Sequence, residues 1–101
     1  MLSKKERVNK ELFHKIFKSG GTIYSSLFSF KYLKNNENRH SFVVSKKISK
    51  KAVLRNKIRR QGYRALAQLP KNSYSGIFIF KNKASFDEIK KEIAFIFTKL
   101  K

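Results

Sequence analysis

The segment KKAVLRNKIRRQGYR, residues 50–64, carries seven cationic side chains and no acidic one. Apolar residues nevertheless recur through it at the spacing of one helical face. On a wheel of ~100° per residue, the members of this apolar stripe fall within roughly 60° of Leu54; they are Leu54, Ile58, Ala65 and Leu69. We therefore predict a helix from about Ser49 to Leu69, ended by Pro70, that packs this stripe against a core.

The opposite side of this predicted helix is expected to present two cationic rows to solvent. One border is formed by Arg55, Arg59 and Tyr63, the other by Lys57, Arg60 and Arg64, with Asn56 between them. Solvated charged faces are common on helices, but they usually alternate Glu with Lys. Here no Asp or Glu occurs within residues 38–86, a window that holds 13 of the 25 Lys and Arg residues. Such an uncompensated face favours a polyanionic partner, which accepts charge-assisted hydrogen bonds.

The composition supports one folded domain over residues 1–101. Hydrophobic residues make up 41% of the chain, with ten Phe and four Tyr, which is enough for one modest core. The formal net charge of +19 destabilises a compact chain unless a polyanion neutralises it. Nucleic acid is the first candidate partner and an anionic membrane surface the second. No apolar run approaches the ~20 residues that span a bilayer, and the N-terminus lacks the apolar core of a secretion signal. We therefore expect a soluble cytoplasmic protein.

The hydrophobic pattern of the first half of the chain predicts one helix and two strands. Residues 4–18 carry an apolar helical stripe, and the Gly20-Gly21 pair is expected to end the helix through a left-handed backbone. Residues 22–33 alternate aromatic and polar side chains from Phe28 onward, which is typical of a half-buried strand. Residues 41–47 predict a second strand, hairpinned to the first across a turn. We also allow for a short extra strand at residues 21–25.

The second half adds the basic helix, one strand and a last helix. GIFIF, residues 76–80, is apolar at every position after its glycine, as expected for a strand covered on both faces. Ser85 and Glu88 have the spacing of a capping box at a helix start. The predicted fold class is α+β, in the order α-β-β-(β)-α-β-α, with a mostly antiparallel sheet packed by helices.

No constellation of catalytic residues is visible in this sequence. The chain has no Cys, and its two His residues, His14 and His40, are isolated. Three of its six acidic residues fall in the last predicted helix, where they suit the cap and the surface. A two-metal nuclease needs clustered carboxylates. We therefore predict no catalytic residue and no metal bound by this protein alone.

Residues 41–66, SFVVSKKISKKAVLRNKIRRQGYRAL, resemble the signature region of the bacterial ribonuclease P protein component. The hallmark of that family is an Arg-Asn-Arg helix after a Ser-Lys-Lys strand end, and here it is Arg55-Asn56-Lys57. Residues 12–33 are similar to the family's amino-terminal pattern of two Phe four apart, then Gly, then a strand. GIFIF followed by an amphipathic helix fits the family's carboxyl half. The resemblance thus covers nearly the whole chain in the right order.

The resemblance implies a protein subunit of ribonuclease P. Such a subunit binds the catalytic RNA and the 5′ leader of precursor tRNA, and it assists removal of the leader by the RNA. The family also has a left-handed β-α-β crossover, against the usual preference. Mg²⁺ would be held mainly by the RNA, and no obligate protein partner is expected.

The resemblance also assigns residues by position. Contacts with the RNA subunit would come from Arg55, Asn56, Lys57 and Arg60, and the lysines before the helix would add non-specific phosphate contacts; these are Lys46, Lys47, Lys50 and Lys51. A leader cleft between the sheet and the first helix would be lined or bordered by Phe13, Phe17, Ser29, Lys31, Arg59 and Tyr63.

Three departures from the family pattern bear on these assignments. Lys57 keeps the charge of the hallmark Arg but loses its planar fork. Gln61 and Gly62 stand where the family usually has an apolar residue and a non-glycine, and Gly62 should cost ~1 kcal/mol relative to Ala in a helix. Tyr63 replaces a usual Arg and could stack on a base instead.

The same residues also fit alternative roles. Phe13 and Phe17, taken alone, suit a core, while Ser29 and Lys31 suit an ordinary solvent face. The main alternative function is a structural ribosomal protein, or another rRNA-binding protein, without a role in cleavage.

Overall fold

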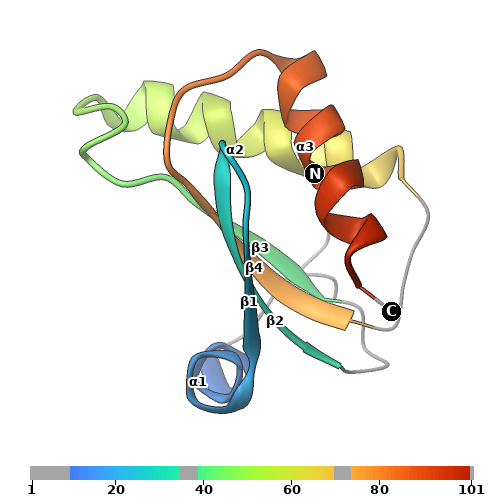
Figure 1. Ribbon diagram of the computed structural model, residues 1–101. Coiled ribbons are helices and arrows are strands. Elements are labelled where there is room, and N and C mark those ends of the chain that lie inside the picture. Colours follow the sequence, from blue (N-terminus) through green and yellow to red (C-terminus); the bar gives the residue numbers. More distant parts are fainter. Residues whose placement is uncertain (1–9, 35–38, 70–73, 101) are drawn as a thin grey trace.

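The computed structural model describes residues 10–34, 39–69 and 74–100. The predicted helix start at residue 4 and the helix stop at Pro70 lie outside these residues, as does most of the predicted turn between the two strands. The described elements follow the predicted order, with the extra strand present (Figure 1). They are α1 (Lys10–Ser19), β1 (Gly21–Tyr24), β2 (Phe28–Lys34), β3 (His40–Val43), α2 (Ala52–Ala67), β4 (Tyr74–Phe80) and α3 (Phe86–Thr98).

The four strands form one mixed sheet in the order β1-β2-β4-β3. β2 pairs antiparallel with both β1 and β4, while β3 pairs parallel with β4, so the β3-α2-β4 segment is a β-α-β crossover. The α+β class with a mostly antiparallel sheet is confirmed. The predicted hairpin between the second long strand and the first is wrong, because β4 lies between β2 and β3. β4 is apolar on both faces, and the sheet centre is where such a strand is covered on both sides.

Helices cover the two faces of the sheet unequally (Figure 1). α2 and α3 pack on one face over the main core, which contains Phe28, Phe30, Phe42, Phe78 and Phe80 among its buried residues. α1 lies on the opposite face, where Leu12 and Ile16 bury Ile77 in a small second cluster. The alternation of β4 thus sends Phe78 and Ile77 into different clusters, which confirms that this strand is covered on both faces.

The buried face of α2 keeps three of the four residues of the predicted stripe, since Ala65 is buried and Ile58 and Leu69 pack against the main core. Leu54 departs from it, and Tyr63 and Leu66 join the buried face. Leu54 is 40% exposed, whereas Tyr63 is only 6% exposed and Leu66 7%. Gly62 is also buried, since the helix approaches the ring of Phe42 closely at this point. The prediction that Leu54 faces the core is wrong, and so is the solvent position of Tyr63. The helix is rotated so that its glycine and tyrosine meet the sheet.

The helix boundaries have local causes that the sequence partly anticipated. The hydroxyl of Ser85 accepts a hydrogen bond from the N–H of Glu88, and the N–H of Ser85 donates one to the Glu88 carboxylate. This confirms the predicted capping box. Gly20 follows α1 as predicted, but its backbone is not left-handed. A side chain there would meet the carbonyl oxygens of Tyr32 and Ile16, so close approach requires the glycine.

No helix among the described residues is long and apolar enough to cross a membrane.

Candidate nucleic-acid interface

Aromatic and cationic side chains meet on the α1 side of the sheet. The rings of Phe13 and Phe17 lie 4.6 Å apart, and the amine of Lys31 lies 5.2 Å from the centre of the Phe17 ring. Phe13 is 37% exposed and Phe17 44%, so both rings flank the buried Leu12–Ile16 stripe rather than joining the core. A cation over an exposed ring is a geometry that can also hold a phosphate beside a stacked base.

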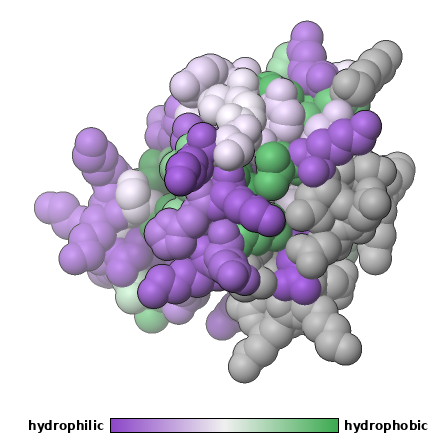
Figure 2. Space-filling view, turned by 90° about the horizontal axis from the view of Figure 1, so that it is seen from below, coloured by the Kyte–Doolittle hydropathy of each residue, from purple (hydrophilic) through white to green (hydrophobic). Residues whose placement is uncertain are grey.

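The sheet continues this surface beyond α1. Strand register places Tyr24, Ser29, Ile79 and Val43 side by side across the four strands, on the same side as Lys31. Tyr24 and Val43 are exposed, and Ser29 and Ile79 are half-buried. We call this set, together with Phe13, Phe17 and Lys31, the α1-side surface. Seen from that side, hydrophilic side chains cover much of the molecule and hydrophobic ones show between them (Figure 2).

The basic residues of α2 are mostly exposed, with two exceptions. Asn56, Lys57 and Arg60 are exposed, as are the four lysines that precede the helix, Lys46, Lys47, Lys50 and Lys51. Arg55 is half-buried, because its Nη1 donates hydrogen bonds of 2.9 Å to the carbonyl oxygens of both Ser49 and Lys50. Arg59 is half-buried too, and its guanidinium donates to Oδ1 of Asn56. Arg55 therefore holds the lysine-bearing loop against the first turn of the helix.

The first turn of α2 lacks the usual features of a helix N-terminus. Lys51 occupies the N-cap position and gives no side-chain cap, and the turn contains no acidic residue. The partial positive charge of the helix end is therefore uncompensated by the side chains around it. Added to the four exposed lysines, it makes this end of α2 attractive to anions such as phosphate.

The structure brings only some of the predicted leader-cleft residues together. Phe13, Phe17, Ser29 and Lys31 share the α1-side surface. Arg59 belongs to α2, which packs on the other face of the sheet. Tyr63 is buried, with its ring 4.9 Å from that of Phe42 and its hydroxyl accepting a hydrogen bond of 3.4 Å from the Phe42 N–H. Base stacking by Tyr63 would require it to leave the core, so this part of the prediction is wrong.

Two features of the site escaped the sequence. The amine of Lys81 lies 5.7 Å from the ring centre of Tyr24, a second aromatic–cation contact on the α1 side. Glu92 binds the turn between β1 and β2, as its Oε1 accepts from the hydroxyl of Ser26 at 2.8 Å and from the N–H of Leu27 at 3.1 Å. Both contacts join positions far apart in the sequence, so no local pattern of residues pointed to either.

The surroundings of Glu92 lower the pKa of its carboxyl group. Burial raises its pKa, but hydrogen bonds from Ser26, Ser25 and the Leu27 N–H, with the charge of Lys81, outweigh this and lower the pKa overall. The carboxylate is thus held in its charged form as a structural anchor.

The described acidic residues do not form a metal site. Within residues 10–34, 39–69 and 74–100, no three His, Asp or Glu side chains lie close enough together to hold an ion. Two of the carboxylates are engaged elsewhere, since Glu88 caps α3 and Glu92 anchors the β1–β2 turn. The acidic side chains of the part of the chain that the structure describes therefore offer no cluster for a Mg²⁺ ion.

These observations define a strongly basic α+β domain that presents aromatic and cationic side chains on one side of its sheet and a cationic helix on the other. The chain belongs to the ribonuclease P protein family, whose model, described as Ribonuclease P, matches residues 2–101. It is 30% identical over 99 residues to the ribonuclease P protein component of Clostridium novyi (strain NT), covering 91% of this chain and 87% of the relative.

Solved structures share the same fold. The ribonuclease P protein of Staphylococcus aureus superposes with a TM-score of 0.79 at 24% identity, covering 97% of each chain. The protein from Thermotoga maritima gives a TM-score of 0.79 at 22% identity, covering 95% of this chain and 98% of that one. Family membership gives this chain a role in tRNA processing as a component of an endoribonuclease with an RNA partner.

Proposed function

We propose that this chain binds the catalytic RNA subunit of ribonuclease P through α2 and the lysines before it, and the 5′ leader of precursor tRNA through the α1-side surface. The observation that carries the proposal is the separation of two cationic regions on opposite faces of one sheet. One region surrounds a helix N-terminus without acidic residues, and the other combines cations with exposed rings. The first suits phosphates of a folded RNA, and the second suits an unpaired strand.

The contact with the RNA subunit is electrostatic and positional. Lys57 and Arg60 extend from the exposed face of α2, with the four lysines near its start. Arg55 acts there in two ways, because its Nη1 holds the loop carbonyls while its charge adds to the same region. Removing one side chain that binds a phosphate should flatten the dependence of log affinity on log salt by about 0.7–0.9.

The contact with the leader combines stacking with charge. Phe13 and Phe17 offer ring surface beside Lys31, and Ser29 lies on the neighbouring position of the same strand face. Arg59, on α2, contributes to the RNA-subunit region in this proposal rather than to the leader. Tyr63 has a structural role, because its ring packs against that of Phe42 in the core.

The chemistry of cleavage belongs to the RNA in this proposal. The protein has no cluster of carboxylates among its described residues, so Mg²⁺ would be held by the RNA subunit and its substrate. The protein neutralises phosphates, which allows the RNA to fold and to bind precursor tRNA at lower Mg²⁺ concentration. We propose the cytoplasm as its compartment, because its RNA partners occur there.

Reconstitution tests this proposal. Precursor tRNA and a bacterial ribonuclease P RNA are incubated at low Mg²⁺ with and without the purified protein, and the protein is also tested alone. We expect the protein to increase leader removal by the RNA and to cleave nothing alone. Cleavage by RNA-free protein would contradict the assignment of chemistry to the RNA. No effect on the RNA would favour a structural rRNA-binding protein instead.

Two pairs of substitutions separate the two faces. Lys57→Ala with Arg60→Ala should weaken RNA-subunit binding and reduce its salt dependence. Phe17→Ala with Lys31→Ala should spare that binding but reduce the preference of the holoenzyme for precursor over mature tRNA, by about 1–2 kcal/mol. Equal loss for both tRNAs in the second pair would show that the α1-side surface is a general RNA contact.

A further inference from the structure

Tyr24 and Lys81 form an exposed aromatic–cation pair to which the proposed function assigns no nucleotide of its own. Tyr24 is 70% exposed, and the Lys81 amine lies 5.7 Å from its ring centre. Tyr24 pairs with Ser29 and lies two residues after Thr22, whose hydroxyl contacts the Lys31 amine at 3.4 Å. Since alternate residues of a strand share a face, Tyr24 lies on the same side of the sheet as Lys31.

This pair repeats the arrangement of Phe17 and Lys31 at another place along the strands. In the strand register, Lys31 pairs with Ile77 of β4. Lys81 lies four residues after Ile77, and its N–H donates a hydrogen bond to the Leu27 carbonyl. At ~3.4 Å per residue the two positions lie ~14 Å apart. That separation places two rings and two cations along one side of the sheet, with Ile79 and Ser29 between them.

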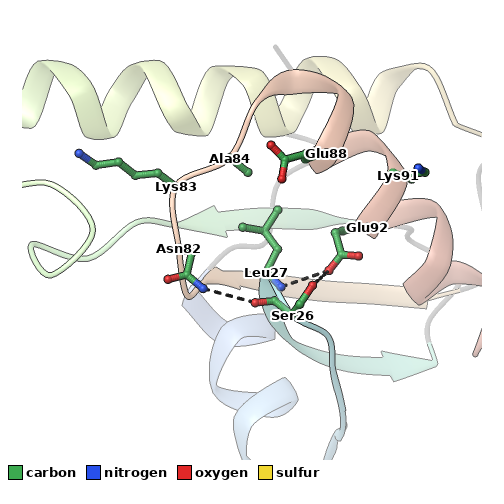
Figure 3. Close-up of a pocket in the computed structure, with 8 residues that line it drawn as sticks. All are labelled: Ser26, Leu27, Asn82, Lys83, Ala84, Glu88, Lys91 and Glu92. Atoms are coloured by element: carbon green, nitrogen blue, oxygen red, sulfur yellow. Dashed lines mark hydrogen bonds between the residues drawn. The ribbon is translucent and has the colours of Figure 1, made fainter.

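The turn between β1 and β2, which follows Tyr24, is tied to α3 and to Asn82, the residue after Lys81 (Figure 3). Glu92 of α3 accepts hydrogen bonds from Ser26 and Leu27, while the side-chain amide of Asn82 donates to the Ser26 carbonyl at 3.5 Å. The Ser25 N–H is bonded to the Phe28 carbonyl at 2.9 Å. Strand and turn are therefore ordered before any ligand arrives, which reduces the entropy lost on binding.

We propose that Tyr24 and Lys81 bind a second nucleotide of single-stranded RNA, so that the α1-side surface holds the leader of precursor tRNA at two separate positions. The Tyr24 ring stacks on a base, and the Lys81 ammonium contacts the adjoining phosphate. Stacking is tolerant of base identity, whereas the cation selects a polyanionic strand. This inference rests on the proposed leader binding and extends it to nucleotides beyond those held at Phe17 and Lys31.

The net charge of +19 and the aromatic–cation chemistry favour RNA over a protein partner at this surface. An apolar patch alone would suit either an RNA or a protein partner. Two rings, each with a lysine amine over it, favour RNA. Three of the four cation–ring contacts among the described residues involve lysine, and the two on the α1 side lie along the same strands.

The test measures holoenzyme affinity for precursor tRNAs whose leaders are lengthened one nucleotide at a time. Wild type should gain affinity in two separate steps. Tyr24→Ala and Lys81→Gln should each remove the same one of these two steps. The affinity should fall about five- to tenfold for leaders long enough to reach this position, and the affinity for shorter leaders should be unchanged. Lys31→Ala should remove the other step. Tyr24→Phe retains the ring and should behave as wild type.

The Phe95–Lys99 pair provides a matched control. Its amine lies 5.1 Å from the ring centre and Phe95 is 45% exposed, but the pair belongs to α3 on the other face of the sheet. Phe95→Ala should leave every leader-length step intact. Circular dichroism checks that each variant is folded, and the exposure of Tyr24 makes loss of folding an unexpected result.

The outcomes separate this inference from the proposed function. If wild type prefers precursor tRNA but Tyr24→Ala and Lys81→Gln alter no step, the second position does not exist. The same conclusion follows if they weaken mature tRNA equally, or if Tyr24→Phe loses the step. If wild type itself shows no preference for a leader, the proposed leader binding fails as well.

Discussion

Replacing Gly62 by Ala sets two opposite expectations against each other. Glycine inside a helix is less favourable than alanine by about 1 kcal/mol, so the sequence alone predicts that Gly62→Ala stabilises α2. The structure predicts the reverse. A Cβ at residue 62 would lie 2.7 Å from Cδ1 and 2.8 Å from Cε1 of the Phe42 ring, well inside van der Waals contact.

The Phe42 ring has little freedom to withdraw. It is 4% exposed, stacks on Phe78 with centroids 4.8 Å apart, and meets Tyr63 edge-on at 4.9 Å. Forcing an extra methyl group into a packed core costs about 1–3 kcal/mol, which exceeds the helical gain. We expect a net loss of about 1 kcal/mol in the free energy of unfolding, or a melting temperature lower by about 4–8 °C.

Thermal and urea unfolding of Gly62→Ala measure this directly, and the Phe42→Leu background supplies the control. Leucine leaves more room at residue 62, so Gly62→Ala should be neutral or stabilising there although Phe42→Leu is itself destabilising. A higher melting temperature for Gly62→Ala in the wild-type background would refute the argument. An equal loss in both backgrounds would show that the Phe42 ring is not the cause.

Three further predictions concern contacts that side chains of α2, of α3 and of its N-cap make with neighbouring parts of the chain. Arg55→Ala should lower the free energy of unfolding by about 1–2 kcal/mol, because two hydrogen bonds to the preceding loop disappear. Arg60 is exposed, so Arg60→Ala should change the free energy of unfolding by no more than about 0.5 kcal/mol. Equal effects of the two substitutions in urea titrations would contradict the assigned contacts. Ser85→Ala should cost about 1 kcal/mol by removing the cap of α3, and unchanged hydrogen exchange in the first turn would argue against it. Because the pKa of Glu92 is lower in the folded chain, its contribution is complete above the ordinary value of about 4.3 and is lost as pH falls through the folded pKa. Glu92→Gln should remove that part of the pH dependence, so superimposable acid-stability profiles would count against the anchor.

Local features of the fold could be predicted from the sequence because their causes are local. The capping box at Ser85 depends on two residues that are three apart in the chain. The strand at residues 76–80 was predicted from its composition alone, and its cover on both faces was confirmed. The cationic character of α2 is likewise a property of consecutive residues.

The candidate site was only partly accessible by the same reasoning. Phe13, Phe17, Ser29 and Lys31 were assigned to one side of the sheet by family resemblance, and they do lie together there. Their roles stay predictions. Tyr63 was misplaced, because the helical wheel centred on Leu54 put it in a solvent-facing row and the resemblance then assigned it by position to the leader cleft.

What the sequence by itself determined is the set of elements, their order and the excess of positive charge, since each follows from residues near one another in the chain. The tertiary structure decided which elements are neighbours. β4 lies between β2 and β3 because its two apolar faces are best covered at the centre of the sheet. Gly62 rather than Leu54 of α2 faces Phe42, because only a glycine allows the helix to approach that ring so closely. The Tyr24–Lys81 and Ser26–Glu92 contacts join residues more than fifty positions apart, so they depend on this packing and have no counterpart in any local pattern.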